Sequence, residues 1–300
     1  MAKGRYRYIE PQAVARLGKL NLVARAVVEG FVTGLHRSPY HGFSVEFSEH
    51  REYAPGDNLR DLDWKALAKT DRFYIKRYEE ETNLKAHILL DTSGSMGYKF
   101  QTDGLSKMEY GCFLAASLSY LMIRQQDSVG IVTFDDKIRN FIPPHSTTSH
   151  LNVMLQKLED LKAGNLTNVS KTFHDLAENI KRRGLIIIIS DLFDEPKEVI
   201  KALRHFRHKK HEVLLFHMFD KAELEFPFTA LSDFVDMETN ETLQADPKYV
   251  REDYLKQIRD FIETYKRDCG EGLVDYIVTR TDFPYDLMLS AYLGKRMRLG

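Results

Sequence analysis

The sequence has little cysteine and almost no net charge. Only Cys112 and Cys269 occur among its 300 residues, which argues against a disulfide framework or a zinc ribbon and favours a reducing compartment. The 43 Lys and Arg residues are balanced by 44 Asp and Glu residues, so the formal charge is -1. We therefore expect no nucleic-acid partner, because proteins that bind the phosphate backbone carry an excess of basic residues.

Long apolar runs are also missing. A helix that crosses a bilayer needs about 18 continuous apolar residues, and the best candidate, 110–123, is shorter and contains Ser117 and Ser119. The basic N-terminal segment has no apolar block of the kind found in secretory signals. We expect a cytoplasmic protein without an integral membrane segment.

The common signatures of nucleotide-binding and esterase sites are absent. The chain contains no G-x-x-x-x-G-K-[ST] motif, and no G-x-G-x-x-G follows its first predicted buried strand. Ser93 is not flanked as in G-x-S-x-G and is a poor candidate for an esterase nucleophile. No enzyme class is indicated by these motifs.

The second part of the chain alternates between two hydrophobic patterns. Short apolar runs bounded by breakers predict buried strands, and the segments between them carry apolar stripes at helical spacing. The predicted strands are 86–90, 129–134, 185–189, 213–219 and 273–279. This alternation predicts an α/β fold with a doubly wound, mostly parallel sheet over 85–300. Asp135-Asp136 predicts a tight hairpin and therefore one antiparallel edge strand.

Residues 1–84 have a different pattern and are predicted to form a separate N-terminal module. A helix is expected over 11–29, followed by alternating segments at 44–48 and 73–78 that could pair as antiparallel strands. The predicted domains are therefore 1–84, an N-terminal helix plus a small β module, and 85–300.

Polar residues follow two of the predicted buried strands. Asp91, Ser93 and Ser95 come after the first strand, and Asp191 follows the strand at 185–189. If these strands are neighbours in the sheet, the two carboxylates converge at one edge, where ligands bind in doubly wound folds. Hard oxygen donors without imidazole or thiolate are typical of sites for Mg²⁺, or for Mn²⁺ as a substitute.

The segment Asp91-Thr-Ser-Gly-Ser95 resembles the DxSxS element of von Willebrand factor A domains. In that family the metal-ion-dependent adhesion site also uses a Thr from a later loop and an Asp after the fourth strand. The resemblance implies Thr167 and Asp191 as the remaining metal ligands. Members usually carry Gly-Gly before this Thr, whereas Asn165-Leu166 stand here, so Thr147 and Thr148 remain alternatives.

An upstream motif resembles the bacterial "domain of unknown function 58" family. It consists of Arg51-Glu-Tyr-Ala-Pro-Gly-Asp57, then Arg60, then Asp63-Trp64-Lys65. The resemblance implies a von Willebrand factor A-like domain, a MoxR-type AAA+ ATPase as partner, and no established catalytic activity. The charged side chains of the motif either anchor the module or form a recognition surface.

These observations lead to a functional prediction. We expect a non-enzymatic, metal-dependent protein-binding or adaptor module in which an acidic side chain of a partner completes the shell of the metal. With the MoxR-type ATPase it would act in the assembly or maturation of protein complexes. The alternative is a Mg²⁺-dependent hydrolase of a phosphorylated substrate, although no nucleophile or base is evident near Asp91. A scaffold with a vestigial metal loop is a third possibility.

Overall fold

The computed structural model describes residues 11–15, 19–36, 51–52, 74–75, 84–164 and 166–297. By compactness the chain divides into two units, one comprising residues 1–34 with 84–300 and the other residues 35–83. Little of the second unit is described, and the division into 1–84 and 85–300 stays a prediction.

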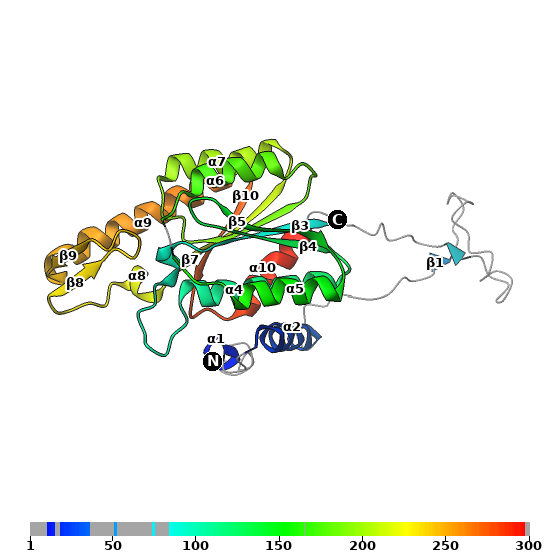
Figure 1. Cartoon of the computed structure of the whole chain (residues 1–300), viewed down its shortest axis with the longest axis horizontal. Helices are drawn as coiled ribbons and strands as arrows, with labels where there is room; N and C mark the ends of the chain where they lie inside the picture. Colours follow the sequence, from blue (N-terminus) through cyan, green and yellow to red (C-terminus); the bar gives the residue numbers. More distant parts are fainter. Residues whose placement is uncertain are drawn as a thin grey trace. The chain divides into compact units, whose positions relative to one another are not determined.

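The larger unit contains a six-stranded sheet with the strand order β10-β7-β6-β3-β4-β5 (Figure 1). Its strands are β3 (Lys85–Asp91), β4 (Ser128–Phe134), β5 (Ile138–His145), β6 (Leu185–Ser190), β7 (Glu212–Phe219) and β10 (Val274–Arg280). All neighbouring strands are parallel except β4 and β5. The five predicted strands and the antiparallel hairpin at Asp135-Asp136 are confirmed, but β10, predicted as buried, is an edge strand and is mostly half-buried.

Helices cover both faces of the sheet, so the predicted doubly wound α/β fold is confirmed. Figure 1 shows α6 (Val169–Asn179) and α7 (Pro196–His208) on one side and α4 (Lys107–Arg124) and α5 (Thr148–Glu159) on the other. Strand β6 is buried along its whole length, as expected for a central strand covered on both faces. Its Ile186 and Ile188 pack in the apolar core with Phe173 of α6 and Phe206 of α7.

Among the described residues two helices precede the sheet in the chain, where the sequence predicts one helix over 11–29. They are α1 (Pro11–Ala15) and α2 (Leu20–His36). Helix α2 buries an apolar stripe with a spacing of three and four residues, which includes Leu20, Val23 and Val27. The backbone N–H of Leu20 donates to Glu159 at the end of α5, at 3.0 Å.

Beyond the last two residues of α2, the smaller unit is described only at β1 (Arg51–Glu52) and β2 (Tyr74–Ile75), which pair antiparallel. Strand β2 lies within the predicted segment 73–78, whereas the predicted segment 44–48 lies outside the described residues. The side chains of the charged motif at 51–65 also lie outside the described part of the chain.

Several elements after β7 were not predicted from the sequence. They are α8 (Lys221–Glu225), β8 (Ser232–Val235), β9 (Thr242–Ala245), α9 (Pro247–Glu271) and α10 (Tyr285–Met297). Strands β8 and β9 form an antiparallel hairpin. Its Phe234 contacts the rings of Phe226 and Phe228, and Phe226 packs on Tyr254 of α9.

No helix within the described segments is long and apolar enough to cross a bilayer.

Candidate metal centre

Two aspartates meet at the carboxyl end of the sheet. Asp91 is the last residue of β3, Asp191 directly follows β6, and these strands are parallel neighbours. Burial, and then the nearby charge of Asp191, raise the pKa of Asp91 to about 7. Two carboxylates this close repel each other unless a proton or a cation lies between them. The convergence expected from the strand ends is therefore present.

The Asp91 side chain is fully buried and is held by two donors. Its Oδ1 accepts from the backbone N–H of Ser93 at 2.9 Å, and its Oδ2 accepts from the Ser190 hydroxyl at 2.5 Å. Ser190 was not recognised from the sequence, although it directly precedes Asp191. Its hydroxyl also accepts from the backbone N–H of Leu192 at 2.9 Å, which fixes its direction.

The hydroxyls of Ser93 and Ser95 lie side by side. Ser93 precedes and Ser95 belongs to the short 3₁₀ turn η2 (Gly94–Gly97), and their Oγ atoms are 3.1 Å apart. Neighbouring ligands of an octahedral Mg²⁺ with bonds of about 2.1 Å are about 3 Å apart, so this pair has a suitable separation. The approach of the Ser95 hydroxyl is among the influences that lower the pKa of Asp191.

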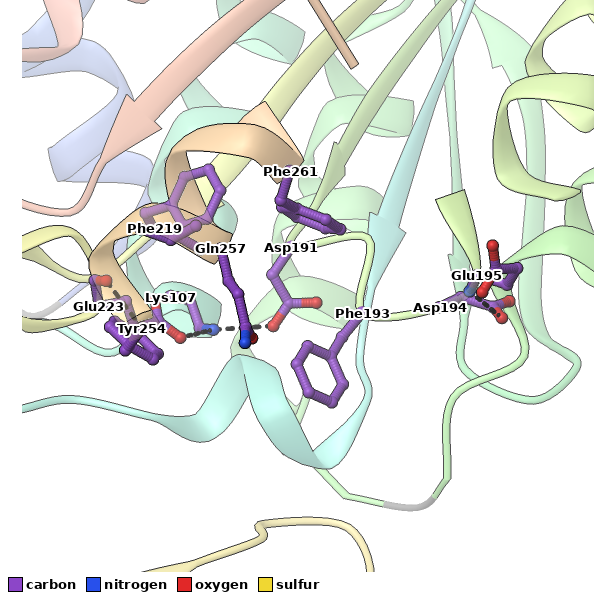
Figure 2. Close-up of a pocket in the computed structure, with 11 residues that line it drawn as sticks. Lys107, Asp191, Phe193, Asp194, Glu195, Phe219, Glu223, Tyr254, Gln257 and Phe261 are labelled. Carbon is purple, nitrogen blue, oxygen red and sulfur yellow. Dashed lines mark hydrogen bonds and ion pairs between the residues drawn. The ribbon is translucent and has the colours of Figure 1, made fainter. Parts of the chain in front are cut away.

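Asp191 has one oxygen in an ion pair, and its other oxygen makes no hydrogen bond to the described residues. Lys107, the first residue of α4, donates from Nζ to Asp191 Oδ2 at 2.8 Å and to Glu223 Oε1 at 2.7 Å (Figure 2). Oδ1 of Asp191 is buried and makes no hydrogen bond within the described part of the chain. A buried polar atom left unpaired in this way marks a place that a water or an ion can fill.

Lys107 and Glu223 were not foreseen from the sequence, and they determine the charge of the site. Burial alone would raise the pKa of Asp191, but the Lys107 ammonium outweighs it and lowers that pKa. Burial also raises the pKa of Glu223, against the opposing effect of Lys107. Lys107 therefore neutralises part of the negative charge that Asp191 and Glu223 bring to the site.

Thr167 lies in the loop before α6 and binds a carboxylate of the chain itself. Its backbone N–H donates to Glu238 Oε2 at 2.9 Å, and its hydroxyl donates to Glu238 Oε1. Glu238 also lies beside the DxSxS loop, because a Cβ on Gly94 would stand 3.3 Å from Glu238 Cγ. Thr167 is thus connected to the loop that contains Ser93 and Ser95.

The two alternative threonines, Thr147 and Thr148, lie at the start of α5. Thr147 is exposed and caps α5, since its hydroxyl accepts from the backbone N–H of His150 at 3.3 Å. Thr148 is exposed in the first turn of the same helix. Their place on α5 favours Thr167 as the ligand from a later loop.

The donor set determines which metal suits the site. Among the described residues, no three His, Cys, Asp or Glu side chains gather into a group that could hold a metal ion. A cation here depends on two carboxylates together with hydroxyl oxygens and water, which fits Mg²⁺ or Mn²⁺ and is unlike a zinc site. The buried, unpartnered Oδ1 of Asp191 supports the same fit.

A cavity of about 430 Å³ opens beside Asp191. Four of its lining side chains are aromatic, namely Phe193, Phe219, Tyr254 and Phe261, and most of the others are charged or polar, with Lys107 and Glu223 at one end (Figure 2). Phe193 is 66% exposed. The candidate metal centre is therefore bordered by apolar surface.

Comparison with known proteins gives one family and several relatives. Residues 49–263 match the family described as "Protein of unknown function DUF58". An uncharacterized protein of Mycobacterium tuberculosis is 25% identical over 297 residues, which cover 96% of this chain and 91% of the relative.

Solved structures from Bacteroides are also similar in fold. The conserved hypothetical protein BatB of Bacteroides thetaiotaomicron is 15% identical, with 72% of this chain and 99% of that chain covered and a TM-score of 0.48. An aerotolerance-related membrane protein of Bacteroides fragilis is 16% identical, with 70% and 97% covered and a TM-score of 0.47.

Proposed function

We propose that this chain, which belongs to the family of proteins of unknown function DUF58, is a non-enzymatic protein-binding module that depends on a divalent cation. The observation that carries the proposal is the buried, unpartnered Oδ1 of Asp191 next to the fully buried Asp91. A buried carboxyl with a raised pKa at the end of a strand, such as Asp91, is typical of functional sites, because such an arrangement is costly without a ligand.

Each side chain has a role in holding the cation. Ser93, Ser95 and Thr167 are the proposed hydroxyl ligands, and Asp91 and Asp191 bind directly or through water. Ser190 and the Ser93 N–H orient the Asp91 carboxylate, while Lys107 fixes the other oxygen of Asp191. A bound Mg²⁺ or Mn²⁺ supplies an open position for an acidic side chain of the partner.

The surroundings of the site support a protein partner. Three exposed apolar side chains stand near site residues in the sequence. Leu166, which precedes Thr167, is 55% exposed, and Phe193, two positions after Asp191, is 66% exposed. Met237, which precedes Glu238, is 48% exposed. Exposed apolar side chains around a polar centre are typical of protein-binding surfaces. From the family resemblance, the proposed partner is a MoxR-type AAA+ ATPase, in the assembly or maturation of protein complexes.

The buried histidine beside Asp191 is held in structural contacts and does not favour the hydrolase alternative. His217 is the buried histidine next to Asp191, and its ring nitrogens contact the Asp191 carbonyl oxygen at 2.9 Å and the Tyr276 hydroxyl at 2.7 Å. Burial lowers the pKa of His217 to about 3. Both nitrogens are therefore occupied in structural contacts.

Metal titration by calorimetry tests the proposed site. We expect the wild type to bind Mg²⁺ and Mn²⁺, and Asp91→Ala and Thr167→Ala to bind each ion at least about tenfold more weakly. Thr147→Ala is the matched control, because it removes an exposed threonine hydroxyl that only caps α5. Circular dichroism verifies that each variant is folded. Equal metal binding by all four proteins would reject the site.

Copurification from the native host tests the partner. A MoxR-type ATPase should be retained by the wild type in Mg²⁺ and lost in EDTA or with Asp91→Ala. Retention in EDTA would indicate a scaffold with a vestigial metal loop. Phosphatase turnover that requires Asp91 would instead support the hydrolase.

A further inference from the structure

Glu238 reaches the candidate metal centre from a distant part of the chain. It lies in the turn between β8 and β9, 71 residues after Thr167, and both of its carboxylate oxygens accept from Thr167. The carboxylate is therefore seated on a hydroxyl that is proposed to bind the cation. None of the family's motif residues corresponds to this position.

The backbone of the hairpin turn is fixed by Asp236. Its Oδ1 accepts from the N–H groups of Glu238 at 2.7 Å and Thr239 at 3.1 Å. Its backbone N–H donates to the Glu241 carbonyl oxygen at 2.9 Å, and its own carbonyl accepts from Asn240 at 2.9 Å. The direction of Glu238 is thus set by local hydrogen bonds as well as by Thr167.

The turn also packs closely on the DxSxS loop. A Cβ on Gly94 would stand 2.7 Å from the Met237 carbonyl oxygen, which is too close for any residue other than glycine. A Cβ on Gly97 would lie 3.7 Å from Cε of Met237. The missing side chain at Gly94 therefore permits the hairpin turn to lie against the loop that bears Ser93 and Ser95.

We propose that Glu238 is the chain's own acidic ligand for the cation and occupies the position that a partner's carboxylate takes. The inference rests on the proposed function. Glu238 accepts from the backbone N–H and the hydroxyl of Thr167, and its Cγ lies 3.3 Å from where a Cβ on Gly94 would stand, so the carboxylate lies between the proposed threonine ligand and the loop that bears Ser93 and Ser95. Among the described residues Glu238 does not gather with Asp91 and Asp191 into a metal-holding group, so its carboxylate reaches the ion by leaving Thr167.

This arrangement has a consequence for binding. A partner's acidic side chain has to displace Glu238 before it reaches the metal, so the hairpin β8–β9 competes with the partner. The aromatic contacts of Phe234 with Phe226 and Phe228 hold the hairpin in place. They therefore influence how readily a partner displaces Glu238. Binding of a partner at this site then depends on Glu238 as well as on the cation.

The test compares Mn²⁺ binding by the wild type, Glu238→Gln and the control Glu241→Gln, which neutralises another acidic residue of the same hairpin. Calorimetry gives the affinity, and the relaxation of water protons reports how much water reaches the bound Mn²⁺. We expect Glu238→Gln to bind Mn²⁺ about tenfold more weakly and to show a higher water relaxation per bound ion. Glu241→Gln should match the wild type in both measurements.

Two other results would overturn the inference, and they differ in what they say of the proposed function. If wild type and Glu238→Gln bind Mn²⁺ equally with the same water relaxation, Glu238 only braces the Thr167 loop and the metal site itself stands. If the wild type binds no Mn²⁺ at all, the proposed function fails together with the inference. Circular dichroism and the melting temperature establish that both variants are folded.

Discussion

Burial of the Asp91 carboxyl at the proposed ligand site lowers the folding stability of the protein near neutral pH. Its carboxyl is fully buried, and burial followed by the charge of Asp191 raises its pKa from 3.8 to about 7. Between about pH 4 and pH 7 the folded protein holds a proton that the unfolded chain has released. Stability contributed by this group is therefore present at low pH and is lost as the pH rises toward 7.

Asp91→Asn should accordingly be more stable than the wild type without metal. The amide carries no charge, so its advantage should grow between about pH 4 and pH 8 and reach roughly 1 to 4 kcal/mol. Denaturant unfolding at several pH values in EDTA measures this difference. Mg²⁺ should stabilise the wild type but not the variant. A constant difference across the pH range would show that Asp91 does not titrate in the folded protein.

The site residues differ in how far the sequence could reveal them. Asp91, Ser93 and Ser95 stand together in one motif, and Asp191 follows an apolar run, so a reader of the sequence can find them. Lys107, Ser190 and Glu238 have no such local signal. Their roles come from contacts with residues 84, 99 and 71 positions away, which only folding brings about.

At the scale of elements, the start of α4 is what places Lys107. Ser106 and Glu109 form a capping box, with the Ser106 hydroxyl accepting from the Glu109 N–H at 3.1 Å and the Glu109 carboxylate accepting from the Ser106 N–H at 2.8 Å. Both contacts satisfy N–H groups that lie next to Lys107 in the chain. The cap therefore connects the stability of the helix to the ion pair with Asp191.

Ser106→Ala should lower the free energy of unfolding by about 1 kcal/mol, because it leaves the Glu109 N–H without its acceptor. Chemical denaturation followed by circular dichroism measures the loss. Glu109→Ala is the companion variant, and its loss should be smaller because the Ser106 cap remains. If Ser106→Ala unfolds at the same denaturant concentration as the wild type, the cap contributes nothing to stability.

The sequence predicts elements well where their apolar pattern is regular. The buried run of β6 and the stripes of α6 and α7 are of this kind, because burial on a sheet imposes the periodicity. The hairpin β8–β9 was missed. Its strands have four residues each, and β9 is largely exposed, so no long periodic pattern marks it.

At the scale of the whole molecule, both thiols are enclosed in the fold. Cys112 is 7% exposed and Cys269 is 1% exposed, and both are free. Burial raises the pKa of each thiol to about 12, with smaller contributions from Glu109 and Asp268 respectively. Thiolates, which are the reactive form, are therefore scarce in the native protein.

A thiol reagent should thus leave the native protein almost unlabelled at about pH 8 and label two cysteines in denaturant. Intact mass measured over time gives the number of labelled thiols. The labelling rate in mild denaturant should follow unfolding, since both cysteines become accessible only when the core opens. Rapid labelling of either thiol in the native protein would contradict this packing. Cys112→Ala and Cys269→Ala would then identify which one is accessible.

The sequence by itself determined the doubly wound sheet, the antiparallel edge and the strand ends that carry Asp91 and Asp191. Those features follow from local patterns, because apolar periodicity and turn residues act over a few positions. Tertiary structure alone decided that Lys107 neutralises one oxygen of Asp191, that the other oxygen has no hydrogen-bond partner in the described part of the chain, and that Glu238 lies on Thr167. Such pairings depend on which distant segments the packed core brings together, and no local pattern records them.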